Sequence, residues 1–236
     1  MNYKISDKLK KHFKRFRYLP EIIMVFVYMK CRFSLSYRDL EEISTIRGLQ
    51  IDHSTIARWI IRFVPLLEKQ ILRKKKPVSD SWRMDETYIK IKNKWYYLYR
   101  AVDAYGNTVD FYLRKYRDTS SARAFFRKSL SNNTKPRKIN IDKSGSNKLA
   151  LTLINKTMDK NKAIEITQSK YQNNIIEQDH RFIKKRVRPM LGFKSFKSAK
   201  ITLAGIEIIR MIQKKQIIDS DSGVNAFQNF KMVMGF

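Results

Sequence analysis

The sequence predicts an α/β protein in which a mixed five-stranded sheet with flanking helices follows an all-helical segment. Residues 20–72 combine apolar residues at helical spacing with helix-capping residues. From residue 82 the pattern changes to short runs rich in aromatic and β-branched residues, which suit strands. Beyond residue 114, helical patterns alternate with short apolar runs, an order typical of helices packed on a sheet.

The chain begins with a basic, aromatic arm, residues 1–19, followed by a predicted helix from Pro20 to about Met29. The arm's Lys and Arg side chains either lie in solvent or neutralise DNA phosphates. The apolar run Ile22–Met29 is much shorter than the roughly 20 residues of a membrane span, so we expect a core helix.

Two further helices predict a helix-turn-helix motif. Ser36 suits the N-cap of a helix over residues 37–47, with Asp39 as a weakened capping box, and Gly48 suits its end. A third helix is expected to begin within residues 52–55 and to run to about residue 69. A plain helical hairpin is the alternative to a DNA-binding motif. The recognition helix would present four polar side chains to a major groove, namely His53, Ser54, Thr55 and Arg58.

Residues 73–81 form a linker by composition, because they combine a charge run, a proline and small polar residues. We therefore expect a DNA-binding domain over residues 1–72, a catalytic domain over 82–218 and a tail over 219–236.

The catalytic domain is expected to open with a β-hairpin whose tight turn contains Asn93, a residue that tolerates left-handed backbone. The expected strands are residues 88–91, 95–102, 108–113, 138–141 and 163–167. The expected helices are residues 120–130, 148–158, 175–187 and 198–215.

Charge is the strongest global feature of the sequence. Fifty Lys and Arg residues against 21 Asp and Glu residues give a net charge of +29 and a pI near 10.2. Such an excess predicts a polyanionic partner, with nucleic acid favoured over an anionic membrane surface. The single cysteine, Cys31, excludes an internal disulfide and a multi-cysteine zinc site. No signal-peptide pattern is present, so a cytoplasmic location is expected.

Three acids are candidates for a metal site. Asp85 heads the first strand, Asp142 ends a later strand, and Glu177 is expected in the first turn of a helix. Hard divalent cations such as Mg²⁺ take oxygen ligands, and metals held by carboxylates activate oxygens in phosphoryl transfer. Three clustered carboxylates without a cation would repel one another. The small-residue loop 143–147 would let a polyanion approach closely.

The helix that carries Glu177 has a basic face. From Arg181 to Lys200 there are eight basic residues and no acid, which favours a track for phosphates over a solvated face of mixed charge. His180 is expected to be a structural partner of this site. The track would consist of the residues at helical spacing after Glu177, namely Arg181, Lys184 and Arg188.

Three segments, residues 82–90, 140–145 and 173–181, resemble bacterial insertion-sequence transposases of the DDE class, and most closely the insertion sequence family numbered six. The resemblance runs from about Pro20 to Lys215. It implies an RNase H-like catalytic fold, a catalytic and metal-binding triad of Asp85, Asp142 and Glu177, and Lys184 as the family's basic residue seven positions later.

The resemblance further implies Mg²⁺-dependent strand cleavage and transfer at terminal inverted repeats, with cointegrate formation; Mn²⁺ can substitute. The partners would be double-stranded repeat and target DNA and a second copy of the chain, at the nucleoid. Departures at Ala57, Asn93 and Lys215 leave the triad intact. Two other classes remain open: a non-catalytic DNA-binding regulator and an RNase H-type or RNA-binding nuclease.

Overall fold

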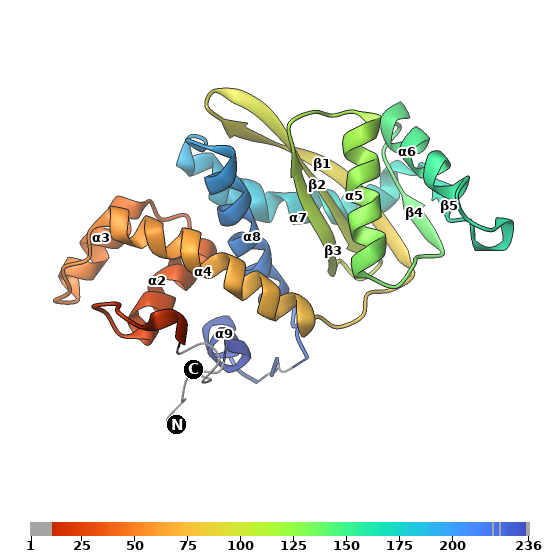
Figure 1. Cartoon of the computed structure of the whole chain (residues 1–236). Helices are drawn as coiled ribbons and strands as arrows, with labels where there is room; N and C mark the ends of the chain where they lie inside the picture. The colour runs from red at the N-terminus through yellow and green to blue at the C-terminus, as the bar shows by residue number, and fades with distance from the viewer. Residues whose placement is uncertain (1–10, 219, 222, 235–236) are drawn as a thin grey trace. The chain divides into compact units, whose positions relative to one another are not determined.

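The computed structural model describes residues 11–218, 220–221 and 223–234, without the side chains at positions 160 and 170. It divides into two compact units. The helical unit contains the chain up to Lys76 together with the chain from Ser195 onward, and the sheet unit is Pro77–Lys194. The chain therefore leaves the helical unit, builds the sheet unit and then returns (Figure 1).

The helical unit is organised around α4 and α8, which pack against each other. α2 packs on both of them, α3 packs on α4, and α9 packs on α8. Arm residues 1–10 lie outside the described residues, and the arm that is described begins with a short 3-10 helix, η1 (Lys11–Phe13). The α-helices of this unit are α2 (Pro20–Arg32), α3 (Tyr37–Ile46), α4 (His53–Arg73), α8 (Phe196–Gln213) and α9 (Ala226–Met234).

The caps of α3 and α4 confirm the helix boundaries expected from the sequence. The Asp39 backbone N–H donates to Ser36 Oγ at 3.0 Å, and the Ser36 N–H donates to the Asp39 carboxylate at 2.6 Å, a complete capping box. Gly48 ends the turn with φ +70°. Asp52 caps α4 by accepting from the Ser54 N–H at 2.7 Å. These contacts fix the two helices of the predicted helix-turn-helix.

The sheet unit contains a five-stranded mixed sheet with the order β3-β2-β1-β4-β5. β1 pairs antiparallel with β2, and β2 with β3, whereas the β1–β4 and β4–β5 pairs are parallel. The β1–β2 turn has positive φ at Lys92 (48°) and Asn93 (61°), as a two-residue type I′ turn requires. The strands are β1 (Ser81–Ile91), β2 (Lys94–Asp103), β3 (Thr108–Arg114), β4 (Lys138–Asn140) and β5 (Glu165–Thr167).

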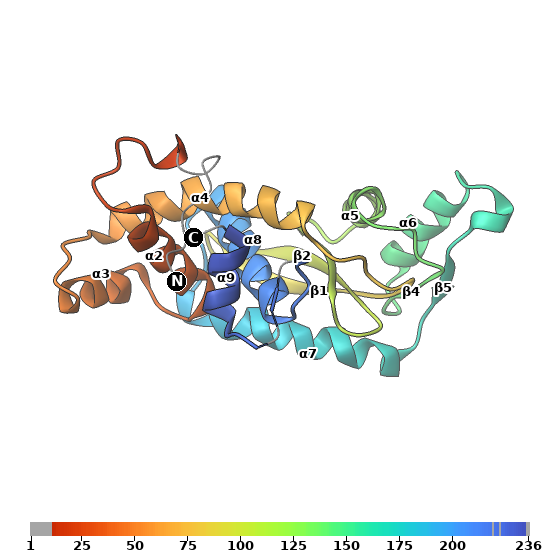
Figure 2. The same ribbon diagram turned by 90° about the horizontal axis from the view of Figure 1, so that it is seen from below.

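Helices cover both faces of this sheet. α5 (Thr119–Asn132) and α6 (Gly145–Asn155) lie on one face and α7 (Lys170–Val187) on the other, as the two views show (Figures 1 and 2). The buried core on the α5 and α6 face joins strand residues such as Trp82 and Ile139 to Phe125 of α5. Two 3-10 segments, η2 (Lys160–Lys162) and η3 (Arg188–Met190), complete the unit.

Three expectations differ from the structure. α7 begins at Lys170, five residues earlier than expected. The sequence did not predict this start, because Ser169 and the polar residues after it lack apolar periodicity. Glu177 is therefore two turns inside the helix and not in its first turn. Residues 195–218 pack in the helical unit rather than extending the sheet unit, and part of the expected tail forms α9. No helix among the described residues is long and apolar enough to span a bilayer.

Gly205 shows why α8 fits the helical unit. A Cβ at this position would collide with Cys31 Sγ of α2 and would lie 3.3 Å from a Val64 methyl of α4.

We expect Gly205→Ala to lower the free energy of unfolding by about 1–3 kcal/mol, the usual cost of overpacking, measured by chemical denaturation. Gly145→Ala is the control, since nothing lies within 4 Å of its Cβ. Adding Cys31→Ala to Gly205→Ala should restore part of the loss; equal stability of Gly205→Ala and the parent would contradict this packing.

Candidate active site

Parallel pairing of β1 and β4 brings the first two predicted acids together. Arg83 is opposite Asn140 in the register, and two residues farther along each chain lie Asp85 and Asp142. Oxygen atoms of Asp85, Glu86 and Asp142 all lie within 4.8 Å of one another. The sequence pattern predicts the meeting of Asp85 and Asp142, whereas nothing in the pattern indicates Glu86.

Glu86 and Asp142 share two hydrogen-bond donors. The Asn147 side-chain amide donates to Glu86 Oε1 at 3.0 Å and to Asp142 Oδ1 at 3.1 Å. The Arg117 guanidinium donates to Asp142 Oδ2 at 2.8 Å and to Glu86 Oε2 at 3.3 Å. One amide and one cation therefore bridge the same two carboxylates and hold their orientations.

Asn147 reaches the acids because the expected loop over residues 143–147 is mostly helix. α6 begins at Gly145, so Asn147 stands in its first turn. The Ser144 backbone N–H donates to Asp142 Oδ1 at 3.1 Å and turns the chain from β4 into this helix. The segment thus positions Asp142 rather than leaving open space beside it.

Burial and mutual repulsion control the charge of the acidic cluster. Burial raises the pKa of Asp85 to about 7, and the charge of Glu86 contributes in the same direction. Burial also raises the pKa of Glu86, against the hydrogen bond from Asn147 and the charge of Arg117. The cluster therefore favours a proton or another cation near neutral pH. Its donor set consists of carboxylate oxygens, which fits a hard divalent metal ion.

Glu177 lies on α7 and lines one cleft with Asp85 and Glu86. The cleft has a volume of about 760 Å³. Among the described residues, Glu177 is not part of the group whose oxygens lie within 4.8 Å. The cleft is also lined by the predicted basic face of α7, namely Arg181, Lys184 and Arg188, and by Lys185.

A buried ion pair anchors α7 to the sheet beside the acids. Arg100, which faces Asp85 in the β1–β2 register, bonds Asp179 at 2.6 Å, and the side chains are only 1% and 4% exposed. Removing one partner of such a pair typically costs about 3–5 kcal/mol. The pair stands two residues from Glu177, so it fixes where Glu177 enters the cleft. No periodicity in the sequence predicts this contact.

His180 lies buried beside Asp85, where a structural partner of the site was expected. Its ring is buried, and Nδ1 lies 3.6 Å from Asp85 Oδ2. Burial lowers the pKa of His180 to about 2, and the charge of Arg100 contributes. The imidazole is therefore neutral, and it adds no positive charge to the site.

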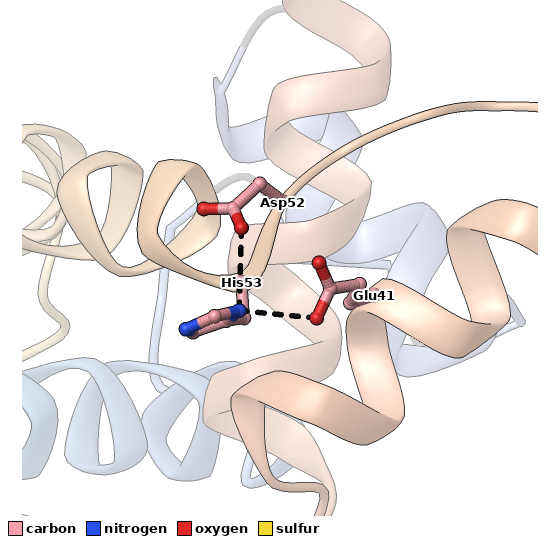
Figure 3. Close-up of side chains that lie close together, drawn as sticks. All are labelled: Glu41, Asp52 and His53. Carbon is pink, nitrogen blue, oxygen red and sulfur yellow. Dashed lines mark hydrogen bonds and ion pairs between the residues drawn. The ribbon is translucent and has the colours of Figure 1, made fainter.

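The four predicted recognition residues lie on the first two turns of α4. His53 Nδ1 is 3.0 Å from Glu41 Oε2 and 3.3 Å from Asp52 Oδ2, so the imidazole lies between carboxylates of α3 and of the α4 cap (Figure 3). Arg58 donates to Thr55 Oγ1 at 2.8 Å and remains exposed. His53, Ser54 and Arg58 are all exposed at the surface, and His53 is also held by the two carboxylates.

Comparisons with known proteins identify the family of this chain. A family model described as a DDE domain matches residues 79–216, and one described as the transposase IS66 family matches residues 15–134. The transposase for the insertion sequence-like element IS431mec of Staphylococcus aureus is 43% identical over 204 residues, 86% of this chain and 89% of the relative. The transposase for IS257 in transposon Tn4003 of the same species has the same identity and coverage.

Solved structures similar to this chain include two integrase catalytic cores. That of HTLV-2, in complex with magnesium, is 16% identical, with a TM-score of 0.42 over 65% of this chain and 98% of that chain. That of BIV is 16% identical, with a TM-score of 0.40 over 58% of this chain and 85% of that chain.

The chain belongs to the DDE-domain transposases, and within them to the insertion sequence family numbered six, which includes the IS431 and IS257 elements. It is a DNA transposase, a metal-dependent polynucleotidyl transferase. This confirms the class expected from the sequence over the regulator and nuclease alternatives.

The raised pKa of Asp85 predicts a pH-dependent stability. Without metal, an Asp that is neutral in the folded state contributes stability that is complete below the unfolded pKa of about 4 and is lost as pH rises through about 7. In chelator, Asp85→Asn should therefore melt above the parent at pH 8 and equal to it below pH 4. Asp80→Asn, at a side chain 64% exposed, is the control. A melting-temperature difference for Asp85→Asn that does not change with pH would contradict this environment.

Proposed function

We propose that Asp85, Asp142 and Glu177 are the catalytic acids of the transposase and bind Mg²⁺, for which Mn²⁺ can substitute. The observation that carries the proposal is the cluster of carboxylate oxygens within 4.8 Å at one end of a cleft whose α7 wall is basic. Such oxygens are the ligands that Mg²⁺ prefers. Glu86 belongs to the same cluster and supports the site through Asn147 and Arg117.

The basic face of α7 receives the DNA. Arg181, Lys184 and Arg188 neutralise phosphates along the cleft, so the scissile phosphodiester lies beside Glu177 and the acidic cluster. The bound metal ion supplies charge stabilisation to the attacking and leaving oxygens. Lys184 stands two turns from Glu177 on the same helix face and positions the terminal nucleotides.

The reaction is strand cleavage followed by strand transfer. Water attacks a phosphorus at the element's end, the bond to the 3′-oxygen breaks, and a 3′-hydroxyl is released. That hydroxyl then attacks a phosphorus of the target DNA and displaces a second 3′-oxygen, which joins the element to the target. Replication of the joined DNA by a polymerase would then give a cointegrate. The substrates are double-stranded terminal inverted repeats and target DNA, held by a dimer at the nucleoid. α4 reads the repeats through Ser54, Thr55 and Arg58, with His53 orienting the start of the helix.

Replacing the acids tests the assignment. Asp85→Asn, Asp142→Asn and Glu177→Gln should each reduce strand transfer on the element's own ends by at least about a hundredfold, because each removes a ligand that a neutral amide replaces poorly. DNA binding in chelator should be unchanged. The exposed Glu165, on the outer strand β5, gives the control Glu165→Gln. Full strand transfer by any of the three variants would remove that residue from the proposed triad.

Asn147 provides a second test that does not depend on turnover. Asn147→Ala should weaken Mn²⁺ binding by roughly 10- to 100-fold, the usual effect of losing a residue that orients metal ligands. The measurement is titration calorimetry on the DNA-free protein. Asn155→Ala, on the same helix with its amide bonded to Ile164, is the control. Equal affinities for Asn147→Ala and the parent would show that Asn147 does not orient the ligands.

A further inference from the structure

The helical unit has a second charged surface that the triad and the α7 track leave unexplained. Residues 15–18 of the arm and the first three turns of α4 line a groove of about 570 Å³. Four arginines line it, Arg15 and Arg17 from the arm and Arg58 and Arg62 from α4. All four side chains are exposed. We call this surface the arginine groove.

The arm is a packed wall of this groove. The Phe13 ring stacks on Phe63 of α4 with centroids 4.6 Å apart and an interplanar angle of 12°. Tyr18 meets the Trp59 ring edge-on at 5.6 Å, and its hydroxyl donates to the Gln50 carbonyl. Aromatic contacts therefore hold the backbone of Arg15 and Arg17 against the helix that carries Arg58.

The arginine groove has a large excess of positive charge. In the part of the chain that the structure describes, none of its four arginines forms an ion pair. Its one acid is Asp52, which accepts from the Ser54 N–H and faces His53. Four guanidinium groups around a single engaged carboxylate would repel one another unless an anion enters. Guanidinium groups bind phosphate oxygens in a forked geometry.

We propose that the arginine groove binds the sugar-phosphate backbone of duplex DNA, with Arg15 and Arg17 as dedicated phosphate contacts beside the α4 recognition surface. This proposal rests on the proposed binding of the element's ends by α4, and it adds the arm as a second part of the protein that contacts the same DNA. Backbone contacts carry no base information. The arm therefore raises affinity equally for repeat and unrelated duplexes.

The test compares the full-length parent with Arg15→Ala/Arg17→Ala by fluorescence anisotropy in chelator, over a range of salt concentrations. The probes are a duplex with the terminal repeat, an unrelated duplex and a single-stranded RNA. A plot of the logarithm of the association constant against the logarithm of the salt concentration has a negative slope, and each lost phosphate contact makes it less steep by about 0.9. For the double variant we therefore expect a slope less steep by about 2. Its Kd near 0.15 M salt should be roughly thirtyfold higher than the parent's, and the factor should be the same for both duplexes.

Two further variants keep the result interpretable. Lys69→Ala/Arg73→Ala removes the same charge from exposed side chains at the other end of α4 and should keep the parent's slope. Arg15→Gln/Arg17→Gln removes the charge but keeps a polar side chain, and it should reproduce the loss.

An arm variant that binds duplex DNA with the parent's Kd and slope would overturn the proposal. A loss confined to single-stranded RNA would overturn it as well. Neither result would affect the proposed function while the parent still binds repeats selectively and transfers strands. A parent that binds no duplex at all would contradict both proposals.

Discussion

The catalytic unit depends on one constraint, the need to keep buried carboxylates close together in a folded protein. Parallel pairing of β1 with β4 leaves Asp85 and Asp142 side by side, and Glu86 adds a third negative group. Desolvation and repulsion both oppose this arrangement. Arg117 and Asn147 offset the cost by bonding two of the acids at once. Arg117 lies just before the start of α5, and Asn147 lies in the first turn of α6. The starts of both helices are therefore near the acids.

The opposite face of the sheet solves a different problem. α7 must present cations to the cleft while one side of it is buried, and its inner side carries the Arg100–Asp179 pair and neutral His180. The side of α7 that lines the cleft carries Glu177 and, after it, the basic residues Arg181, Lys184 and Arg188. The contacts that hold the helix are therefore separate from the basic side chains that line the cleft.

Local signals made much of the fold predictable. The hairpin turn at Asn93, the Ser36 capping box and the Gly48 helix end follow from backbone chemistry that a short segment specifies by itself. Asp85 and Asp142 were expected to meet, because the sequence pattern placed both at strand ends and the motifs around them resemble a known family; in the structure β1 begins four residues before Asp85. The proposed roles of the triad and of the DNA-contacting residues go beyond what the geometry alone specifies.

Features that depend on distant partners were not predictable. Side chains of Asp85 and Glu86 alternate along a strand, so the pattern gave no reason to place both in one cluster. The Arg100–Asp179 pair joins residues 79 positions apart. α8 is apolar around nearly its whole circumference, with buried residues from Ala199 to Ile212. Such a helix fits any core, and its sequence does not say which one.

The return of the chain to the helical unit has a consequence for biosynthesis. Residues 77–194 are complete on the ribosome before α8 emerges, and α8 is a central element of the unit that contains α4. The sheet unit of a nascent polypeptide is therefore complete while the helical unit still lacks one of its central helices. A message truncated before codon 196 would yield every acid of the cleft but no finished helical unit.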